Sequence, residues 1–223
     1  MSFNIAIDGP AGAGKSTIAK AVSAKLGFVY VDTGAMYRTL ALFFLRNGFK
    51  SDEEDKIVAS LDGVTVKLAY VDGAQQVLLN DENVTGLIRT EEVGNMASAS
   101  SVYGPVRKKL LNLQQDMAKT TDVIMDGRDI GTHVLPNAQL KIYLTATSKV
   151  RANRRYLELT EKGIECNVED IEKDIIERDH RDMNREIAPL KQAEDAVYVD
   201  TSDMTIDEVI ATIIKLYEDK KGA

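Results

Sequence analysis

Short runs of apolar, often β-branched residues recur along the chain and predict five strands of one sheet. The runs are residues 3–7 (FNIAI), 28–31 (FVYV), 122–125 (DVIM), 140–144 (LKIYL) and 196–199 (AVYV). Each run is continuously apolar instead of alternating with polar residues, so it fits a strand that is covered on both faces. We therefore expect a sheet that lies between layers of helices.

Segments with helical periodicity fall between these strands. They are residues 16–26, 35–46, 93–118, 149–162 and 168–182. A last helix begins at a capping box formed by Thr205 and Glu208 and runs to about Tyr217. The alternation of strands and helices predicts an α/β fold with a mostly parallel, doubly wound sheet of five strands.

Residues 64–86 break this alternation, because apolar and polar positions alternate along them. The segment carries an Asp72-Gly73 pair, which favours a tight turn between two strands. We therefore expect a small antiparallel β insert within the α/β chain.

Composition limits the class of protein. The chain has 223 residues, 44% of them hydrophobic, which suffices for one principal domain with a sizeable core. No run approaches the roughly 18 apolar residues that cross a bilayer. The net charge of -7 argues against a nucleic-acid partner, since such binding needs a basic face. The single cysteine, Cys166, cannot form an internal disulfide, so we expect a cytoplasmic protein.

The stretch GPAGAGKS, residues 9–16, matches the phosphate-binding loop (P-loop) pattern G-x-x-x-x-G-K-[ST] and lies between a strand and a helix. Its glycines allow consecutive backbone N–H groups to converge on phosphate oxygens. Lys15 would reach the β- and γ-phosphates, and the Ser16 hydroxyl would ligate Mg²⁺. The pattern predicts that a nucleoside triphosphate and Mg²⁺ bind at Gly9, Pro10, Ala11, Gly12, Ala13, Gly14, Lys15, Ser16 and Thr17.

Such a loop is shared by GTPase switches, mechanical ATPases and small-molecule kinases. The chain has no Asn-Lys-x-Asp element that would read guanine. Asp126 ends an apolar strand without a following carboxylate that could polarise water. We therefore favour a small-molecule kinase. Two alternatives stay open: a kinase of another small metabolite than the acceptor inferred below, and a regulator that binds nucleotides without catalysis.

Arginines indicate where an acceptor would bind. Six of the eleven arginines lie between Arg151 and Arg185. Arg178, Asp182 and Arg185 are spaced to lie along one helical face. No Asp-His pair stands out as a base, and a phosphate acceptor needs none because it is already an ionised nucleophile. The pattern favours an acceptor that carries a phosphate group.

Several motifs together resemble the bacterial cytidylate kinases, in the long form with an inserted sheet. The matching stretches are residues 7–17 (IDGPAGAGKST), 31–38 (VDTGAMYR), 88–98 (IRTEEVGNMAS), 126–132 (DGRDIGT) and 177–190 (ERDHRDMNREIAPL). The resemblance implies a P-loop kinase that moves the γ-phosphoryl group of ATP to CMP or dCMP. It also implies a single kinase domain over residues 1–223. Its parts would be a core (about 1–35, 87–150 and 186–223), a monophosphate-binding region with the insert (about 36–86) and a lid (about 151–185).

The resemblance also implies roles for individual residues. Lys15, Arg128, Arg154 and Arg185 would be catalytic. The acceptor phosphate would contact Arg38, Arg128 and Arg185; the cytosine would contact Ser98, Arg107 and Asp129; the ribose would contact Arg178 and Asp182. Thr33 stands where the family commonly has serine, and it keeps the hydroxyl for substrate contact. Arg154 and Arg155 would belong to the lid that closes on ATP. We expect a monomer, since no heptad seam or long apolar stripe is evident.

Overall fold

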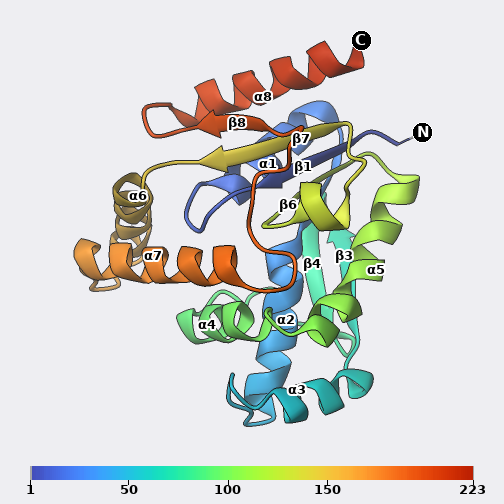
Figure 1. Cartoon of the computed structure of the whole chain (residues 1–223), viewed down its shortest axis with the longest axis vertical. Helices are drawn as coiled ribbons and strands as arrows, with labels where there is room; N and C mark the ends of the chain where they lie inside the picture. The colour runs from blue at the N-terminus through green and yellow to red at the C-terminus, as the bar shows by residue number, and fades with distance from the viewer. Residues whose placement is uncertain (1, 223) are drawn as a thin grey trace. The chain divides into compact units, whose positions relative to one another are not determined.

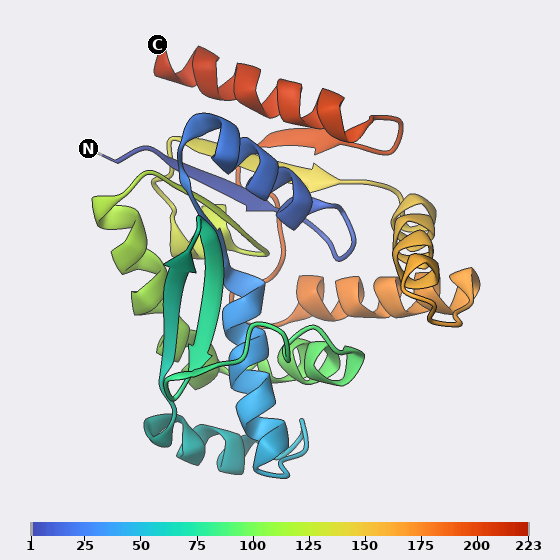
Figure 2. The same cartoon turned by 180° about the vertical axis from the view of Figure 1, so that it is seen from behind.

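The computed structural model describes residues 2–222, which divide into two compact units. The first unit comprises residues 2–30 and 121–222, and the second comprises Val31–Thr120. Figures 1 and 2 show the elements of both units from opposite sides. Each unit has its own hydrophobic core, so each is described separately.

The first unit is built on a five-stranded sheet with the order β2-β6-β1-β7-β8. Its strands are β1 (Asn4–Asp8), β2 (Val29–Asp32, which ends in the second unit), β6 (Val123–Gly127), β7 (Leu140–Thr145) and β8 (Val197–Asp200). The β1–β6, β1–β7 and β7–β8 pairs are parallel, as the apolar runs predict. In this arrangement the carboxyl ends of the central strands lie at the same edge of the sheet, where α/β proteins bind ligands.

Four helices belong to the first unit: α1 (Lys15–Leu26), α6 (Ser148–Glu161), α7 (Val168–Asn184) and α8 (Ile206–Lys221). Helices α1 and α8 pack on the sheet and close one core with it, in which Val22 and Ile213 meet Ile7, Ile142 and Leu144. These five side chains are almost fully buried. The capping box expected at the start of α8 is present, since the Thr205 and Glu208 side chains each bond the other's backbone N–H.

The second unit contains α2 (Thr33–Arg46), α3 (Glu54–Ser60), a 3₁₀ turn (Leu61–Gly63), α4 (Glu91–Ser100) and α5 (Gly104–Thr120). Its three short strands, β3 (Val66–Val71), β4 (Ala74–Leu79) and β5 (Glu82–Asn83), form a separate antiparallel sheet. Asp72 and Gly73 join β3 to β4 with φ of 51° and 75°, as an Asp-Gly hairpin turn requires. The predicted β insert is confirmed.

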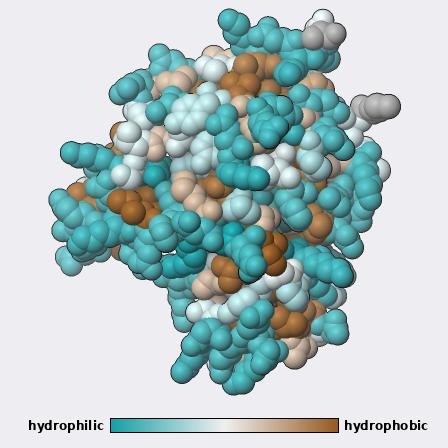
Figure 3. All heavy atoms as spheres, viewed as in Figure 1, coloured by the Kyte–Doolittle hydropathy of each residue, from teal (hydrophilic) through white to brown (hydrophobic). Residues whose placement is uncertain are grey.

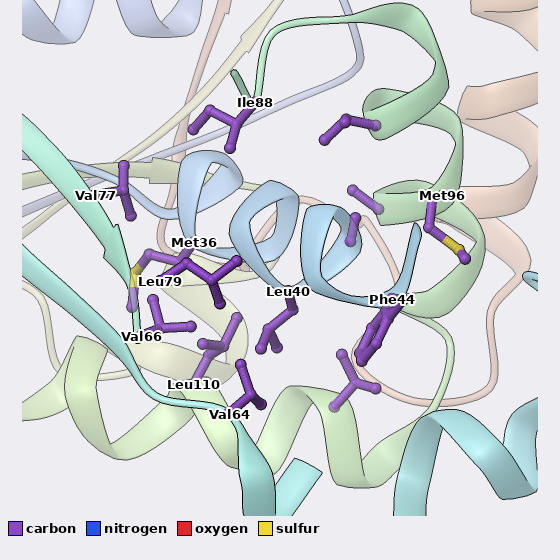
Figure 4. Packing of buried hydrophobic residues seen from close by; sticks show 14 of the residues in the cluster. Met36, Leu40, Phe44, Val64, Val66, Val77, Leu79, Ile88, Met96 and Leu110 are labelled. Atoms are coloured by element: carbon purple, nitrogen blue, oxygen red, sulfur yellow. The ribbon is translucent and has the colours of Figure 1, made fainter. Parts of the chain in front are cut away.

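A single core holds the second unit together (Figure 4). Met36, Leu40 and Phe44 recur on one face of α2 at helical spacing and are fully buried. They meet Leu110 of α5 and the apolar face of the β3–β4 hairpin. The buried face of α2 therefore fixes this helix in the second unit and restrains the residues at its start.

The prediction of one helix over residues 93–118 is wrong, because the structure has two helices there. Helix α4 ends at Ser100 and α5 begins at Gly104. Pro105 explains the break, since proline has no N–H to donate within a helix and is tolerated in a first turn. The consequence is that Ser98 and Arg107 lie on different helices.

No helix among residues 2–222 is long and apolar enough to cross a membrane. On the face shown in Figure 3, hydrophobic residues form small separate patches within a mainly hydrophilic surface. Scattered apolar residues of this kind are ordinary on globular proteins.

Candidate active site

The P-loop follows β1 and leads into α1 as predicted. Gly14 precedes the helix with φ of 84°, and Lys15 is the first helical residue. Gly9 has φ of 151°, and a Cβ atom built there would lie 1.9 Å from the carbonyl oxygen of Leu144. Only glycine fits at this position, because the loop runs directly over β7. The loop and the start of α1 thus present backbone N–H groups that suit a phosphate.

Ser16 and Asp126 form the candidate magnesium site. The Ser16 hydroxyl donates to Asp126 Oδ2 over 2.8 Å, and the Tyr30 hydroxyl donates to Asp126 Oδ1 over 2.9 Å. A hydroxyl beside a carboxylate supplies the hard oxygen atoms that Mg²⁺ prefers. Residues 2–222 hold no group of three or more His, Cys, Asp or Glu side chains that could bind a metal. The donors therefore fit a Mg²⁺ ion that takes most of its ligands from phosphate and water.

Lys15 is buried among charges of both signs, with Arg128 and Arg178 opposed by Asp126 and Asp8. Its Nζ atom is buried and donates to the carbonyl of Pro10 over 2.7 Å. The pKa of Lys15 is held well below its usual value by burial and then by repulsion from Arg128, with Arg178 adding to the effect. Cations crowded in this way are relieved when an anion binds among them. The chemistry around Lys15 therefore suits a bound anion.

A network of two arginines and two aspartates lies in the same unit. Arg128 donates from Nε to Asp182 Oδ2 over 2.9 Å, and Arg185 donates from Nη2 to Asp129 Oδ1 over 3.2 Å. Arg185 Nη1 also lies 3.9 Å from Asp182 Oδ1. Helix α7 ends at Asn184, so Arg185 does not continue the helical face as expected, yet the network includes it. The structure brings together these predicted residues from the segment after β6, from α7 and from the segment after α7.

Electrostatics keep this network charged. Burial alone would raise the pKa of Asp182, but Arg128 and Arg178 more than offset this and hold its pKa below the usual range. Burial would likewise lower the pKa of Arg128, but Asp182 raises it further than burial lowers it. Each charge is therefore stabilised by its partner in a region with little access to water.

Asp8, the last residue of β1, was not among the predicted site residues. Its Oδ1 accepts the N–H of Ile130 over 2.8 Å, and its Oδ2 accepts the N–H of Gly131 over 2.7 Å. These donors begin a one-turn π-helix, Ile130–Val134, directly after Arg128 and Asp129. Burial raises the pKa of Asp8 to about 6. A carboxylate at the end of a buried strand was the only sequence signal for this anchor.

Arg151 and Asp179 bind the P-loop from α6 and α7. The Ala11 N–H donates to Asp179 Oδ1 over 2.9 Å, and Arg151 Nη1 donates to the Ala11 carbonyl over 2.7 Å. Both side chains are buried and contact each other directly. Sequence reasoning noted Arg151 only as the first of the clustered arginines and did not single out Asp179, so this anchor was missed.

Arg154 and Arg155 point to other partners. Arg154 Nη2 donates to the carbonyl of Thr201 over 2.6 Å, in the segment after β8. Arg155 Nη1 donates to Glu158 on the same helix over 2.8 Å. Both side chains are partly exposed. Arg154 is therefore bound to the segment after β8, and Arg155 forms an ion pair within α6.

The second unit holds the other predicted substrate residues. Arg107 is buried, lies over the ring of Tyr37 at 5.5 Å from its centroid, and donates from Nη1 to the Ser101 carbonyl over 3.2 Å. Ser98 is buried on α4, and its carbonyl accepts the Ser101 hydroxyl over 2.9 Å. The break between α4 and α5 therefore brings the region of Ser98 close to the guanidinium of Arg107.

Thr33 and Arg38 lie on α2, which begins at a well-fixed N-cap. Asp32 caps the helix by accepting the Ala35 N–H over 2.9 Å and also pairs with Arg89. Thr33 is buried in the first turn, and Arg38 is half-buried one turn later. The structure thus groups Thr33, Arg38, Ser98 and Arg107 in one unit and the P-loop with Arg128, Asp129, Arg178, Asp182 and Arg185 in the other.

The fold and the P-loop together define the class of protein. The chain is similar to a shikimate kinase from Acinetobacter baumannii, solved with shikimate, with a TM-score of 0.50 and 15% sequence identity. The match covers 99% of this chain and 96% of that one. This likeness shows the P-loop kinase fold of a parallel sheet surrounded by helices.

The chain belongs to the cytidylate kinase family, whose model matches residues 5–219. It is 52% identical over 215 residues to a cytidylate kinase of Caldicellulosiruptor saccharolyticus, covering 96% of this chain and 95% of that one. It is 48% identical over 212 residues to a cytidylate kinase of Halalkalibacterium halodurans, covering 95% and 96%. The resemblance read from the sequence motifs is confirmed.

Proposed function

We propose that this protein transfers the γ-phosphoryl group of ATP to CMP or dCMP and so forms ADP with CDP or dCDP. The observation that carries the proposal is the P-loop between β1 and α1, with buried Lys15 as the first residue of the helix and Arg128 and Arg178 acting on its charge. A lysine and two arginines in one charged region suit two phosphate-bearing substrates. Membership of the cytidylate kinase family supports cytidine nucleotides as the acceptors.

The P-loop binds ATP in this proposal. Its backbone N–H groups and Lys15 contact the β- and γ-phosphates, and Ser16 with Asp126 holds Mg²⁺. The metal ion, when bound, neutralises part of the negative charge that develops between the donor phosphates. Lys15 must release the Pro10 carbonyl to reach a phosphate, and the approach of a phosphate favours its charged form.

Arginines hold the acceptor phosphate, with Arg38 acting together with Arg128 and Arg185. A guanidinium group suits this task because its planar fork bonds two phosphate oxygens and stays charged. Arg178 and Asp182 contact the ribose, and Thr33 offers a hydroxyl to the substrate.

Ser98, Arg107 and Asp129 recognise the cytosine. The exocyclic amine of cytosine can donate to a hydroxyl or carboxylate oxygen. Uracil has a carbonyl there instead, and the unpaired acceptor would weaken binding by about 1 to 3 kcal/mol.

The transfer step requires no general base. An ionised oxygen of the acceptor phosphate attacks the γ-phosphorus and forms the new P–O bond. The bond from the γ-phosphorus to the bridging oxygen breaks, and its electron pair stays on ADP. The catalytic residues Lys15, Arg128, Arg154 and Arg185 stabilise the negative charge while the two nucleotides are held in line.

Arg154 and Arg155 act from the lid, residues 151–185, which closes on ATP and excludes water. Arg154 must then leave Thr201, and Arg155 must leave Glu158. In this proposal the core comprises about residues 1–35, 87–150 and 186–223, and the monophosphate-binding region comprises about residues 36–86. We expect a monomeric, cytoplasmic enzyme that acts on small molecules only. Light scattering after size-exclusion chromatography tests whether the protein is a monomer.

A coupled assay of ADP release tests the proposal with CMP, dCMP, UMP, AMP and shikimate as acceptors. CMP or dCMP should be used best, and an equal or greater rate with another acceptor would reject the proposed specificity. Asp129→Ala should impair CMP use and leave the KM for ATP unchanged. An unchanged KM and kcat for CMP would contradict the role of Asp129.

A further inference from the structure

The guanidinium of Arg38 is held by the chain that leads into α4. Arg38 Nη1 donates to the carbonyl of Ile88 over 3.1 Å and to the carbonyl of Thr90 over 3.3 Å. Thr90 is the N-cap of α4, and its hydroxyl accepts the Val93 N–H. All these residues belong to the second unit, and the start of α4 fixes the position of the Arg38 guanidinium.

Gly94 lies on the first turn of α4, on the side that faces Arg38. A Cβ atom at Gly94 would lie 3.0 Å from Nη1, 3.0 Å from Nη2 and 3.3 Å from Cζ of Arg38. These separations are shorter than ordinary van der Waals contacts between carbon and nitrogen. Glycine therefore leaves the space that the guanidinium occupies.

The backbone does not require glycine at this position. Gly94 has no positive φ, and its N–H makes the ordinary helical bond to the Thr90 carbonyl over 3.1 Å. Glycine weakens a helix relative to alanine, so α4 gains nothing locally from having it. The close approach of Arg38 is the feature of the structure that accounts for glycine here.

We propose that Gly94 is a positioning residue for the acceptor phosphate, because its missing side chain lets the Arg38 guanidinium lie against α4. The inference rests on the proposed function, in which Arg38 contacts that phosphate. The group in conflict with a Cβ is the far end of a flexible side chain, which moves more easily than helix backbone. A methyl group at residue 94 would therefore push the guanidinium away by a few tenths of an ångström and strain its bonds to Ile88 and Thr90, while the fold persists.

Gly94→Ala tests the inference through two measurements, kcat/KM for CMP and the melting temperature, of which only the first should fall. We expect kcat/KM for CMP to fall about 10-fold to 100-fold, because a small misplacement of a binding group strongly affects phosphoryl transfer. The KM for ATP should not change. The melting temperature should stay the same or rise, because alanine favours the helix. A clear fall in melting temperature, or unchanged kcat/KM for CMP, would overturn the proposal.

Two further variants separate this inference from the proposed function. Asn95→Ala changes the next, exposed residue of α4 and should leave CMP use unchanged. In an Arg38→Ala background, Gly94→Ala should have no additional effect on kcat/KM, because the group that it displaces is already missing. If Arg38→Ala itself leaves CMP use intact, the role of Arg38 in the proposed function fails. If only Gly94→Ala is without effect, the inference fails alone.

Discussion

Arg151 Nη1 donates to Asp179 Oδ2 over 2.6 Å, and this buried pair also binds the N–H and the carbonyl of Ala11. Arg151 comes from α6, Asp179 from α7 and Ala11 from the P-loop. A residue whose N–H and carbonyl are both hydrogen-bonded has little freedom, so the pair fixes the start of the nucleotide-binding loop.

Asp179→Ala should destabilise the fold by about 3 to 5 kcal/mol, because it leaves the buried Arg151 charge without its partner. The KM for ATP should also rise, since Ala11 loses one anchor. Urea unfolding and steady-state kinetics measure the two effects. Asp174→Ala removes an exposed carboxylate from the same helix and should do neither. Equal stability of the two variants would contradict the importance of the buried pair.

Asp8 should make stability depend on pH in a particular direction. Its pKa is raised to about 6 from 3.8, so the folded protein holds this proton over a range where the unfolded chain releases it. The contribution of Asp8 to stability is therefore present below the unfolded pKa and is lost as the pH rises through about 6. A shift of about two units corresponds to on the order of 3 kcal/mol.

Asp8→Asn isolates this effect, because asparagine does not titrate. The unfolding free energy of the original protein minus that of the variant should fall between about pH 4 and pH 6 and stay level above this range. Denaturant titrations at several pH values measure the difference. A difference that rises with pH would show that the carboxylate, and not the protonated acid, is favoured by the fold.

Asp126→Asn should weaken the binding of Mg²⁺, because the amide cannot accept from Ser16 and Tyr30 as a carboxylate does. The Mg²⁺ concentration that gives half-maximal activity should rise about 10-fold to 100-fold. Tyr30→Phe removes only the hydroxyl donor to Asp126 and should have a smaller effect in the same direction. An unchanged Mg²⁺ requirement in Asp126→Asn would remove this carboxylate from the metal site.

Gly9→Ala should destabilise the fold by more than about 3 kcal/mol, because its Cβ would overlap the Leu144 carbonyl. Gly27→Ala is the matched control. Gly27 also has a positive φ, of 71°, but no atom lies within 4 Å of its Cβ position. Its cost should be about 1 kcal/mol from backbone strain alone. Similar losses in the two variants, measured by urea unfolding, would mean that the contact with β7 does not matter.

The sequence was sufficient for features that depend on local pattern. The five strands, the β insert and the P-loop could be predicted because apolar runs, alternation and a fixed motif specify them directly. The break at Pro105 was missed although its signal is local, because the apolar pattern continues across it.

Contacts between distant residues were harder to predict. Asp8 bonds a backbone N–H 122 residues further along, and Asp179 bonds one 168 residues before it. Nothing in the neighbouring residues of either aspartate specifies such a partner. The Arg128–Asp182 pair was not predicted either, because the family resemblance assigned Arg128 to the phosphate and Asp182 to the ribose without pairing them.

The charges around Lys15 have a consequence for stability. Arg128 and Arg178 repel the buried charge of Lys15, while Asp126 and Asp8 attract it. A ligand that brings negative charge beside Lys15 favours its charged form, and it binds the folded chain only. Nucleotide phosphates should therefore raise the melting temperature of the protein.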